Sequence, residues 1–253
     1  VSIMGSGIEA TIIKYETATT GTFNFIQLGS NQKISNLQIQ LTSTGGNNKN
    51  CMYGTGITNC YLQNLKIVVS GSTLKNCGIL IDSSTTLPVS EVKRCILDIS
   101  GATQQNMGLQ IVSSSPNLEN LNIKISGNPG SVSSFTASET LGPVGNVGIY
   151  SNKSDVELLS SEISVSGNTE ASGGNSGIVS YSSTSNSGNP YLFQLFNSKV
   201  VTNDINNNAI QNSLTSTDSY KTDSKFYTLV STSCSLGGSL VPKLTFIEEA
   251  DSN

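Results

Sequence analysis

A short phrase of alternating apolar residues recurs along the chain and restricts its fold more than any other feature. It reads LQNLKIVVSG at residues 62–71 and LENLNIKISG at residues 118–127. Apolar residues at every second position indicate a β-strand with one buried face, and the closing Ser-Gly indicates a turn. A second phrase, such as NCGILI at residues 76–81 and NMGLQI at 106–111, lies between the copies. Two strands and two corners repeated in this order predict a coil of stacked turns.

Two independent registers support this repeat. The first phrase aligns at six centres, which are Leu37, Leu65, Cys95, Leu121, Ser161 and Ser198. The second phrase aligns at six asparagines, which are Asn50, Asn76, Asn106, Asn146, Asn175 and Asn207. Successive copies lie roughly 26 to 40 residues apart, and inserted loops explain the longer spacings. The sequence therefore predicts an all-β solenoid of roughly eight turns in one domain over residues 1–247, with an acidic tail over residues 248–253.

The repeated pattern L-x-N-L-x-I-x-I-S-G … N-x-G-I and the opening segments GSG (5–7) and TII (11–13) resemble a known superfamily. This is the right-handed parallel β-helix, or pectate-lyase-like, superfamily, whose pattern covers roughly residues 1–247. Such domains occur in phage tailspikes, giant-virus proteins and polysaccharide-processing enzymes. Leucine-rich repeats fit less well, because they carry one strand per repeat of 20–29 residues. The resemblance implies a right-handed parallel β-helix but leaves the chemistry open, since one fold serves many functions.

The ends of such a coil need covering, because a terminal turn exposes apolar side chains and unpaired backbone. The chain opens within a strand pattern at residues 1–3, and no helix pattern precedes it or follows Phe246. We therefore expect either that the chain is a segment of a longer protein or that partner chains cover its ends.

Composition excludes several classes of function. The formal net charge of −4 argues against a nucleic-acid surface, which needs a basic stripe. No run of 18 apolar residues predicts a membrane span. The chain has no His and no Cys/His constellation, so we expect neither a metal site nor a cofactor.

The cysteines are predicted to face the interior. Cys51 and Cys77 align in one column with Met107 and Val147, and Cys95 aligns with the core leucines. Buried reduced thiols behave as small apolar side chains. A Cys51–Cys77 disulfide between adjacent turns stays open as an alternative, since stacked strands lie within bridging distance. The odd total of five cysteines favours folding in a reducing cytoplasm.

The two asparagine columns are interpreted as structural. Asn tolerates left-handed backbone at tight corners, and stacked amides can bond to one another along the stack. The ladder is the set of six asparagines that opens the second phrase. Arg94 occupies a corner column that otherwise holds Asn36, Asn64, Asn120 and Asn197, so we interpret it as a substitution at a corner.

Catalytic groups are sparse. The hydrolases of the superfamily use Asn-Thr-Asp, Asp-Asp, Gly-His-Gly and Arg-Ile-Lys motifs, and the chain has none of them. Two carboxylates suffice for glycoside hydrolysis. The candidates are Glu119 and Glu157, predicted to be neighbours in one outward column, together with Asp155 and Glu162. Lyases of the superfamily use an Arg base, for which Arg94 is the only candidate in the chain. Solvated surface acids explain the same residues without catalysis.

Two hypotheses of function follow. In the first, the chain is a non-enzymatic attachment module of a virion, fibre, spike or cell surface, built from several subunits, with a homotrimer as one form. Candidate residues for binding a partner or a glycan are Phe135, Glu139, Leu141, Tyr150 and Tyr181, the first three of them in an inserted loop. In the second, the chain is a polysaccharide lyase or glycoside hydrolase.

Overall fold

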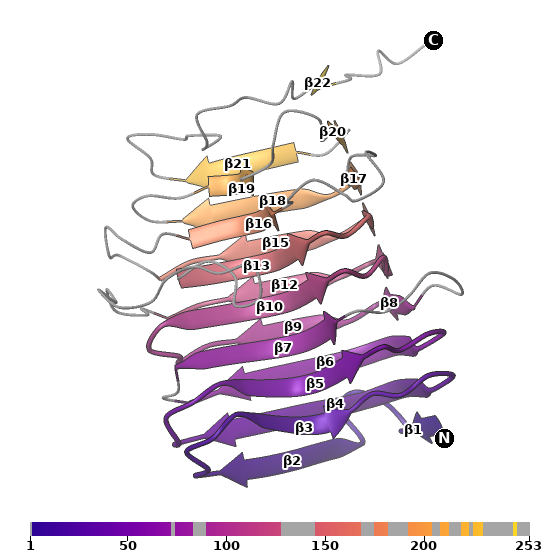
Figure 1. The fold of residues 1–253 in the computed structure, drawn as a ribbon, viewed down its shortest axis with the longest axis vertical. Helices are drawn as coiled ribbons and strands as arrows, with labels where there is room; N and C mark the ends of the chain where they lie inside the picture. Colours follow the sequence, from indigo (N-terminus) through magenta and orange to yellow (C-terminus); the bar gives the residue numbers. More distant parts are fainter. Residues whose placement is uncertain are drawn as a thin grey trace.

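The computed structural model describes residues 2–71, 74–82, 90–127, 145–167, 175–181, 192–203, 208–212, 219–222, 225–229 and 245–246. These residues form a parallel β-solenoid, and no helix occurs among them. Figure 1 shows the strands stacked as successive layers, from β2 near the N-terminal end to β21 near the other end. The all-β solenoid predicted from the sequence is thus confirmed. Within the described part of the chain, no helix has the length and apolar character needed to cross a bilayer.

Three faces surround the core. The first face holds β1 (Ser2–Met4), β8 (Glu91–Lys93), β11 (Asn117–Glu119), β14 (Val156–Leu159), β17 (Leu192–Phe196), β20 (Ser219–Thr222) and β22 (Thr245–Phe246). The second face holds β2 (Ile12–Thr17), β9 (Ile96–Ile99), β12 (Asn122–Ile125), β15 (Glu162–Val165), β18 (Lys199–Asn203) and β21 (Lys225–Leu229). The third face holds β3 (Phe23–Gln27), β5 (Lys49–Thr55), β7 (Lys75–Asp82), β10 (Gln105–Val112), β13 (Gly145–Asn152), β16 (Asn175–Tyr181) and β19 (Asn208–Asn212).

The first two faces are continuous in the early turns. Strands β4 (Lys33–Ser43) and β6 (Tyr61–Ser70) each run through both. The first part of β6 pairs with β8, and its second part pairs with β9. The sequence predicted two strands per turn because its first phrase spans this corner without a Gly or Pro. From the third regular turn on, the structure divides the phrase into two strand segments, β8 and β9 being the first such pair, so that these turns have three strands.

Five regular turns run from β4 to β16, which makes a solenoid of about five turns. The roughly eight turns predicted from the sequence also counted the strands at the two ends. Strands β1 to β3 precede the regular turns and are largely exposed, and the strands after residue 192 are separated by residues outside the description. The repeat pattern continues there, but the regular three-faced turn is described only between these ends.

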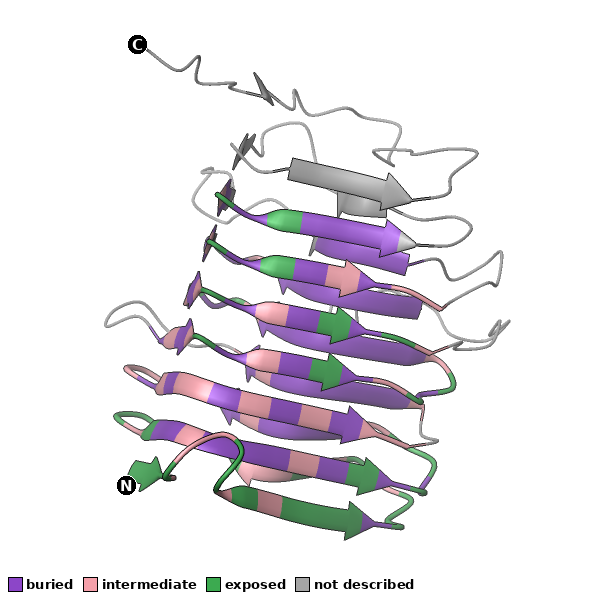
Figure 2. Ribbon diagram, turned by 180° about the vertical axis from the view of Figure 1, so that it is seen from behind, coloured by how far each residue is buried: buried purple, intermediate pink, exposed green. Residues whose placement is uncertain are grey.

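The core consists of columns in which each apolar side chain lies on its equivalent in the next turn. Ile39, Ile67, Leu97, Ile123, Ile163 and Val200 form one fully buried column across the second face. Met52, Ile79, Leu109, Ile149 and Ile178 form the facing column. Figure 2 shows how burial alternates with exposure along the second-face strands. Each of these side chains contributes about 1.5–3 kcal/mol through burial.

The corner between the first and second faces needs a left-handed residue in every turn. Asn36, Asn64, Arg94, Asn120, Ser160 and Asn197 occupy it, with φ between 46° and 59°. Asn adopts this conformation more readily than most residues, and its side chain also bonds locally. The Nδ2 of Asn64 donates to Oδ1 of Asn36 at 2.7 Å. Arg94, at φ 53°, therefore lies at a corner position, as its column in the sequence indicated.

The asparagine ladder lies at the start of the third-face strands. Asn106 donates to Oδ1 of Asn146 at 2.9 Å, and Asn146 donates to Oδ1 of Asn175 at 3.0 Å. Asn146 also donates to the carbonyl oxygens of Gly127 and Ser166 at the corners of adjacent turns. All three asparagines are fully buried. The ladder thus links each third-face strand to the corner before it.

Asn50 was wrongly placed in this ladder. In the structure Lys49 lies opposite Asn76, and Asn50 lies opposite Cys77 and donates to Asn24 at 2.8 Å. The Nζ of Lys49 donates to the carbonyl oxygens of Thr19 and Gly21, as Asn76 does to those of Gly71 and Ser100. The matching Asn-Cys letters suggested the wrong register, whereas the packing of Met52 against Ile79 sets it. Asn207 lies outside the described residues.

A glycine column beside the ladder lets the turns approach closely. A Cβ on Gly148 would lie 2.4 Å from the carbonyl oxygen of Gly177 and 2.4 Å from Cγ2 of Ile163. Gly78 and Gly108 meet the backbone of the next turn in the same way. Any side chain at these positions would separate the stacked strands.

We expect Gly148→Ala to lower the free energy of unfolding by about 1–3 kcal/mol, because the added methyl group overpacks the core. Urea unfolding followed by circular dichroism measures this change. Gly46→Ala is the matched control, since a Cβ there meets nothing within 4 Å. Equal midpoints for the two variants would contradict the close approach of the turns.

We expect Asn146→Ala to lower the free energy of unfolding by about 2–3 kcal/mol, because buried carbonyl and amide groups lose their partners. The same urea titration measures it. Asn122→Ala removes an asparagine from an outward position one face away and is expected to change stability by less than about 0.5 kcal/mol. A similar loss in both variants would show that the ladder contributes nothing beyond an ordinary surface amide.

Candidate functional site

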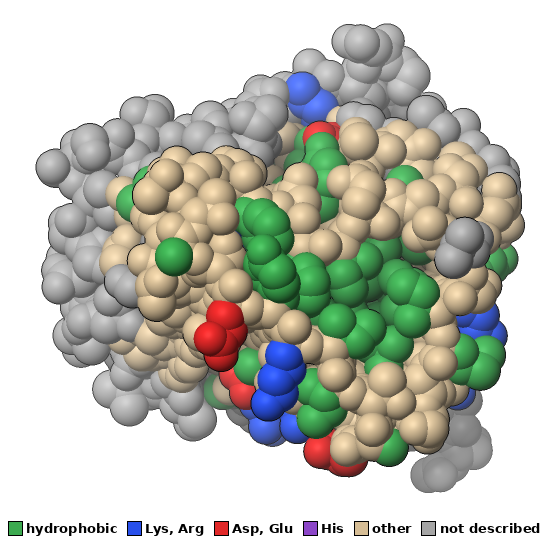
Figure 3. Space-filling view, turned by 90° about the horizontal axis from the view of Figure 1, so that it is seen from below, with side chains coloured by type: hydrophobic (Ala, Val, Ile, Leu, Met, Phe, Trp, Pro, Cys, Tyr) green, Lys and Arg blue, Asp and Glu red, His purple; other side chains and the backbone are tan. Residues whose placement is uncertain are grey.

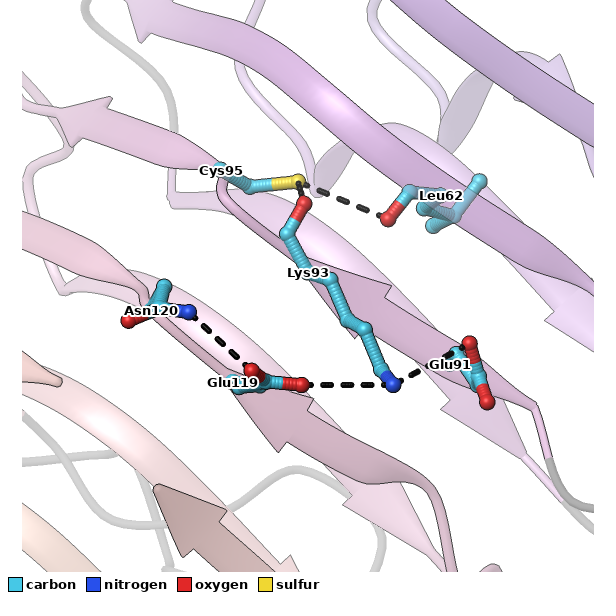
Figure 4. A network of polar contacts seen from close by, with 6 residues as sticks. All are labelled: Leu62, Glu91, Lys93, Cys95, Glu119 and Asn120. Carbon is cyan, nitrogen blue, oxygen red and sulfur yellow. Dashed lines mark hydrogen bonds and ion pairs between the residues drawn. The ribbon is translucent and has the colours of Figure 1, made fainter. Parts of the chain in front are cut away.

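A cluster of three charged side chains lies on the outer surface of the first face. Strands β8 and β11 are neighbours, and Lys93 lies directly opposite Glu119. The Nζ of Lys93 is 3.2 Å from Oε2 of Glu119 and 3.4 Å from Oε2 of Glu91. Asn120 donates to the other oxygen of Glu119 at 3.1 Å. Figure 4 shows Lys93 between the two carboxylates, so the three charges form one connected network.

The electrostatics of this cluster are those of a surface ion-pair network. The hydrogen bond from Lys93 to Glu119 holds the pKa of Lys93 above its ordinary value, and the charge of Glu91 acts in the same direction. The three side chains keep between 25% and 36% of their surface exposed. A partly exposed network of this kind offers hydrogen-bond donors and acceptors to a hydroxylated ligand. It contributes little to stability, because solvent screens it.

The predicted pairing of Glu119 with Glu157 is wrong. Glu119 lies opposite Leu159, and Glu157 lies opposite Asn117. The two glutamates are therefore offset by two residues on adjacent strands and do not face each other. On the second face, Asn122 pairs with Glu162, and the first-face strands just before them keep the same spacing between the two turns. Glu119 therefore pairs with Leu159 and not with Glu157.

The other catalytic candidates lie apart from one another. Glu162 forms an ion pair with Lys199 at 3.1 Å on the second face, with about half of each side chain exposed. Asp155 is exposed just before β14. Arg94 is exposed at its corner, and its backbone N–H donates to the carbonyl oxygen of Glu119. The described residues contain no group of three or more His, Cys, Asp or Glu placed to hold a metal ion.

Sequence reasoning missed Glu91 and the role of Lys93. A signal was present, since Glu91 and Lys93 lie at alternate positions just before a corner, one turn away from Glu119. Alternate residues of a strand share a face, and the repeat places the next turn beside them. Because the sequence pattern predicted two strands per turn, the first face was not recognised as separate. The residues of that face in successive turns were therefore not aligned with one another.

Tyr150 was predicted as a candidate for binding a partner or a glycan, but its side chain is only 1% exposed. It belongs to a second apolar cluster with Cys77, Met107, Val147 and Val179. Ile149 points into the core, so Tyr150 after it lies on the outer side of the third face. Gly148 also faces the core, since a Cβ there would lie 2.4 Å from Cγ2 of Ile163, so Val147 before it lies on the outer side too. Phe135, Glu139 and Leu141 lie outside the described residues, as does the side chain of Tyr181.

The same cluster decides the state of Cys77. Cys51 belongs to the main core and Cys77 to the outer cluster, so the prediction that Cys77 faces the interior of the solenoid is wrong. The disulfide left open by the sequence does not form, and Cys51, Cys60, Cys77 and Cys95 are free and buried. Burial raises the pKa of the Cys77 and Cys60 thiols to about 11 and that of Cys95 to about 12. These thiols stay protonated at neutral pH.

Lys75 brings a charge into this buried outer region. Its side chain is buried, and its Nζ donates to Oε1 of Gln110, which lies in the same column as Tyr150. Burial lowers the pKa of Lys75, because the charged ammonium loses its hydration. Neutralising this group should therefore favour the folded state.

Comparison of the chain with protein-family models, with curated proteins and with solved structures found no significant match in any of the three.

We expect the pH dependence of stability to reveal the buried Lys75. Its pKa in the folded state lies below the ordinary value of 10.5, so the unfolded chain binds more protons between the two values. Stability from this group therefore rises as the pH rises towards 10.5. The free energy of unfolding of the wild type minus that of Lys75→Met should increase with pH over this window.

Chemical denaturation at a series of pH values measures that difference. Lys124→Met is the matched control, since Lys124 is exposed on β12, and its difference curve should be flat. The raised pKa values of the Cys60 and Cys95 thiols act in the opposite direction but cancel in both differences, because these cysteines are unchanged. Lys75 also lowers the pKa of Cys77, so all variants are compared in a Cys77→Ala background. A flat curve for Lys75→Met would contradict the burial of this ammonium.

Proposed function

We propose that this chain is a non-enzymatic structural module that serves as a rigid spacer and attachment surface within a larger assembly. One observation carries the proposal, which is the stack of five regular turns from β4 to β16 around one continuous apolar core. Before these turns, and among the described residues, β1 and β2 pair with β4, and β3 pairs with β5.

The side chains of this end are apolar and exposed. Met4 is 67% exposed, Ile12 44%, Tyr15 41% and Ile3 40%. Figure 3 looks onto this end and shows hydrophobic side chains gathered over its middle, with charged side chains at several places around it. Exposed apolar patches of this kind mark sites where another polypeptide packs.

The regular turns support the spacer role. Their core columns, left-handed corner residues and buried third-face donors recur in every turn from β4 to β16, which favours a rigid stack. The resemblance of the repeat to fibre and spike domains favours a virion or a cell surface as the setting, with several subunits in the assembly. Glycan binding at the polar outer surface around Lys93 is a subsidiary part of the proposal.

A carbohydrate-active enzyme is the alternative. It is favoured by the resemblance to pectate-lyase-like enzymes and by the carboxylates on the outer side of β11 and β14. We expect no unsaturated products and no new reducing ends when the chain is incubated with acidic polysaccharides. Turnover that is lost in Glu119→Gln or Glu157→Gln would support the enzyme and contradict the structural role.

The structural role is tested by locating the chain in its native source, through mass measurement and imaging of the intact particle or cell surface. We expect it within a symmetric assembly in which the β1–β3 end is covered. In that assembly a thiol-reactive probe should fail to reach Met4→Cys but should label Ser115→Cys, which is exposed at the corner before β11. A free monomer with both positions labelled would contradict the proposal.

A further inference from the structure

The outward side of the second face, here called the second-face flank, offers only side chains to a partner. Strands β9, β12 and β15 each have a paired neighbour on both sides, so their backbone groups are satisfied. Alternate residues of these strands point outward, and those of successive turns lie over one another in columns. The two columns hold Lys66, Ile96, Asn122 and Glu162, and Val68, Asp98, Lys124 and Ser164. None of these side chains is buried, as Figure 2 shows for this face.

Two opposite charges at the centre of the second-face flank have no partner. Lys124 lies directly opposite Asp98 on the adjacent strand, and both side chains are exposed. Within the described part of the chain, neither has a hydrogen bond or an ion pair. One positive and one negative group are therefore available side by side at the middle of the regular turns.

The charges of this flank are complementary to those of a second copy. Two flanks can pack face to face about a twofold axis that runs parallel to the strands, midway between β9 and β12. Asp98 then faces the partner's Lys124, and Lys66 faces the partner's Glu162. Lys66 and Glu162 also have ion-pair partners within their own chain, but they keep 30% and 50% of their side chains exposed. All four charges thus meet a charge of opposite sign.

Charge disfavours the neighbouring arrangements. An axis through β9 or through β12 places two copies of Asp98 or two copies of Lys124 against each other. An axis that runs along the solenoid through this column does the same for both residues. An axis between β6 and β9 places Asp98 against the partner's Val68, and one between β12 and β15 places Lys124 against the partner's Ser164. Because like charges in contact are costly and unpaired charges gain nothing, charge selects one register.

The side chains around the charges fit the same register. Val68 faces the partner's Ser164, and Ile96 faces the partner's Asn122, so the contact covers two partly exposed apolar side chains. The next outward position holds only short hydroxyl residues, which are Thr42, Ser70, Ser100, Ser126 and Ser166. Such residues let two sheets approach to the usual face-to-face distance of about 10 Å. A contact that uses the same patch on both copies closes after two chains.

We propose that a second copy of this chain packs on the second-face flank, so that two solenoids lie side by side and antiparallel about a twofold axis between β9 and β12. The inference deepens the proposed function and rests on it, because it names one partner and one surface for the attachment role. The contact uses only three outward side chains of each strand, so we expect a weak dimer with a dissociation constant of about 1–100 μM.

Sedimentation over roughly a hundredfold range of concentration around that value tests the dimer, because a reversible dimer dissociates on dilution. We expect the wild-type chain to shift from monomer to dimer as its concentration rises. Asp98→Lys and Lys124→Asp each place like charges opposite each other twice, and each should weaken the dimer at least about tenfold. The double variant Asp98→Lys/Lys124→Asp restores the opposite charges and should recover the dimer. Lys33→Asp makes the same change of charge at an exposed position of the first face and should leave dimerisation unchanged.

Cross-linking tests the register directly. In a mixture of Lys66→Cys and Glu162→Cys chains, the two new thiols face each other across about 10 Å, and a bis-maleimide that spans about 10 Å should join them. In Lys66→Cys alone, the two thiols are also displaced by three strand spacings and lie about 17 Å apart, so the same reagent should not join them. Wild-type chains give the background from native cysteines.

Three outcomes would overturn the inference. A monomer at every concentration excludes the second copy but leaves the attachment role standing with a different partner. A dimer that responds to neither Asp98→Lys nor Lys124→Asp places the contact on another surface. A dimer in which the mixed Lys66→Cys and Glu162→Cys chains are not joined contradicts the register. The proposed function fails separately, if the chain proves free in its native source or turns over a polysaccharide.

Discussion

The stacking of each inward side chain on its equivalent in the next turn is the constraint on which the rest of the structure depends. Parallel strands in register allow Ile39 to contact Ile67, and Ile67 to contact Leu97, so one residue type serves every turn. A shift of one residue would move a whole strand's apolar set to the solvent side. The corners and the ladder therefore serve to hold this register.

The polar residues of the interior follow from the same stacking. A corner leaves backbone carbonyl groups inside the solenoid, where no strand can pair with them. Asn76 and Asn146 donate to those groups, and Lys49 does so with a longer side chain in the first regular turn. The chemistry required is a donor of suitable length, which explains why an asparagine and a lysine share one column.

The flanks of the solenoid leave few backbone groups unpaired. Along them, every regular strand has a neighbour on both sides, and charged groups such as Lys93 are paired within the chain. Translation along one axis satisfies the backbone of each regular turn in the same way.

The sequence by itself determined the all-β solenoid, the inward columns and the left-handed corner that includes Arg94, because period-2 alternation and corner residues are local signals. It also placed Cys51, Cys77 and Cys95 among buried residues, but not the side of the sheet that Cys77 occupies. Only the tertiary structure decided that a turn has three faces, that Lys49 replaces Asn50 in the ladder, and that Glu119 and Glu157 do not meet. These depend on register, which is set by the packing of side chains from distant turns. Tyr150 shows the same limit, since a strand pattern tells which side of a sheet a ring occupies but not whether that side is covered.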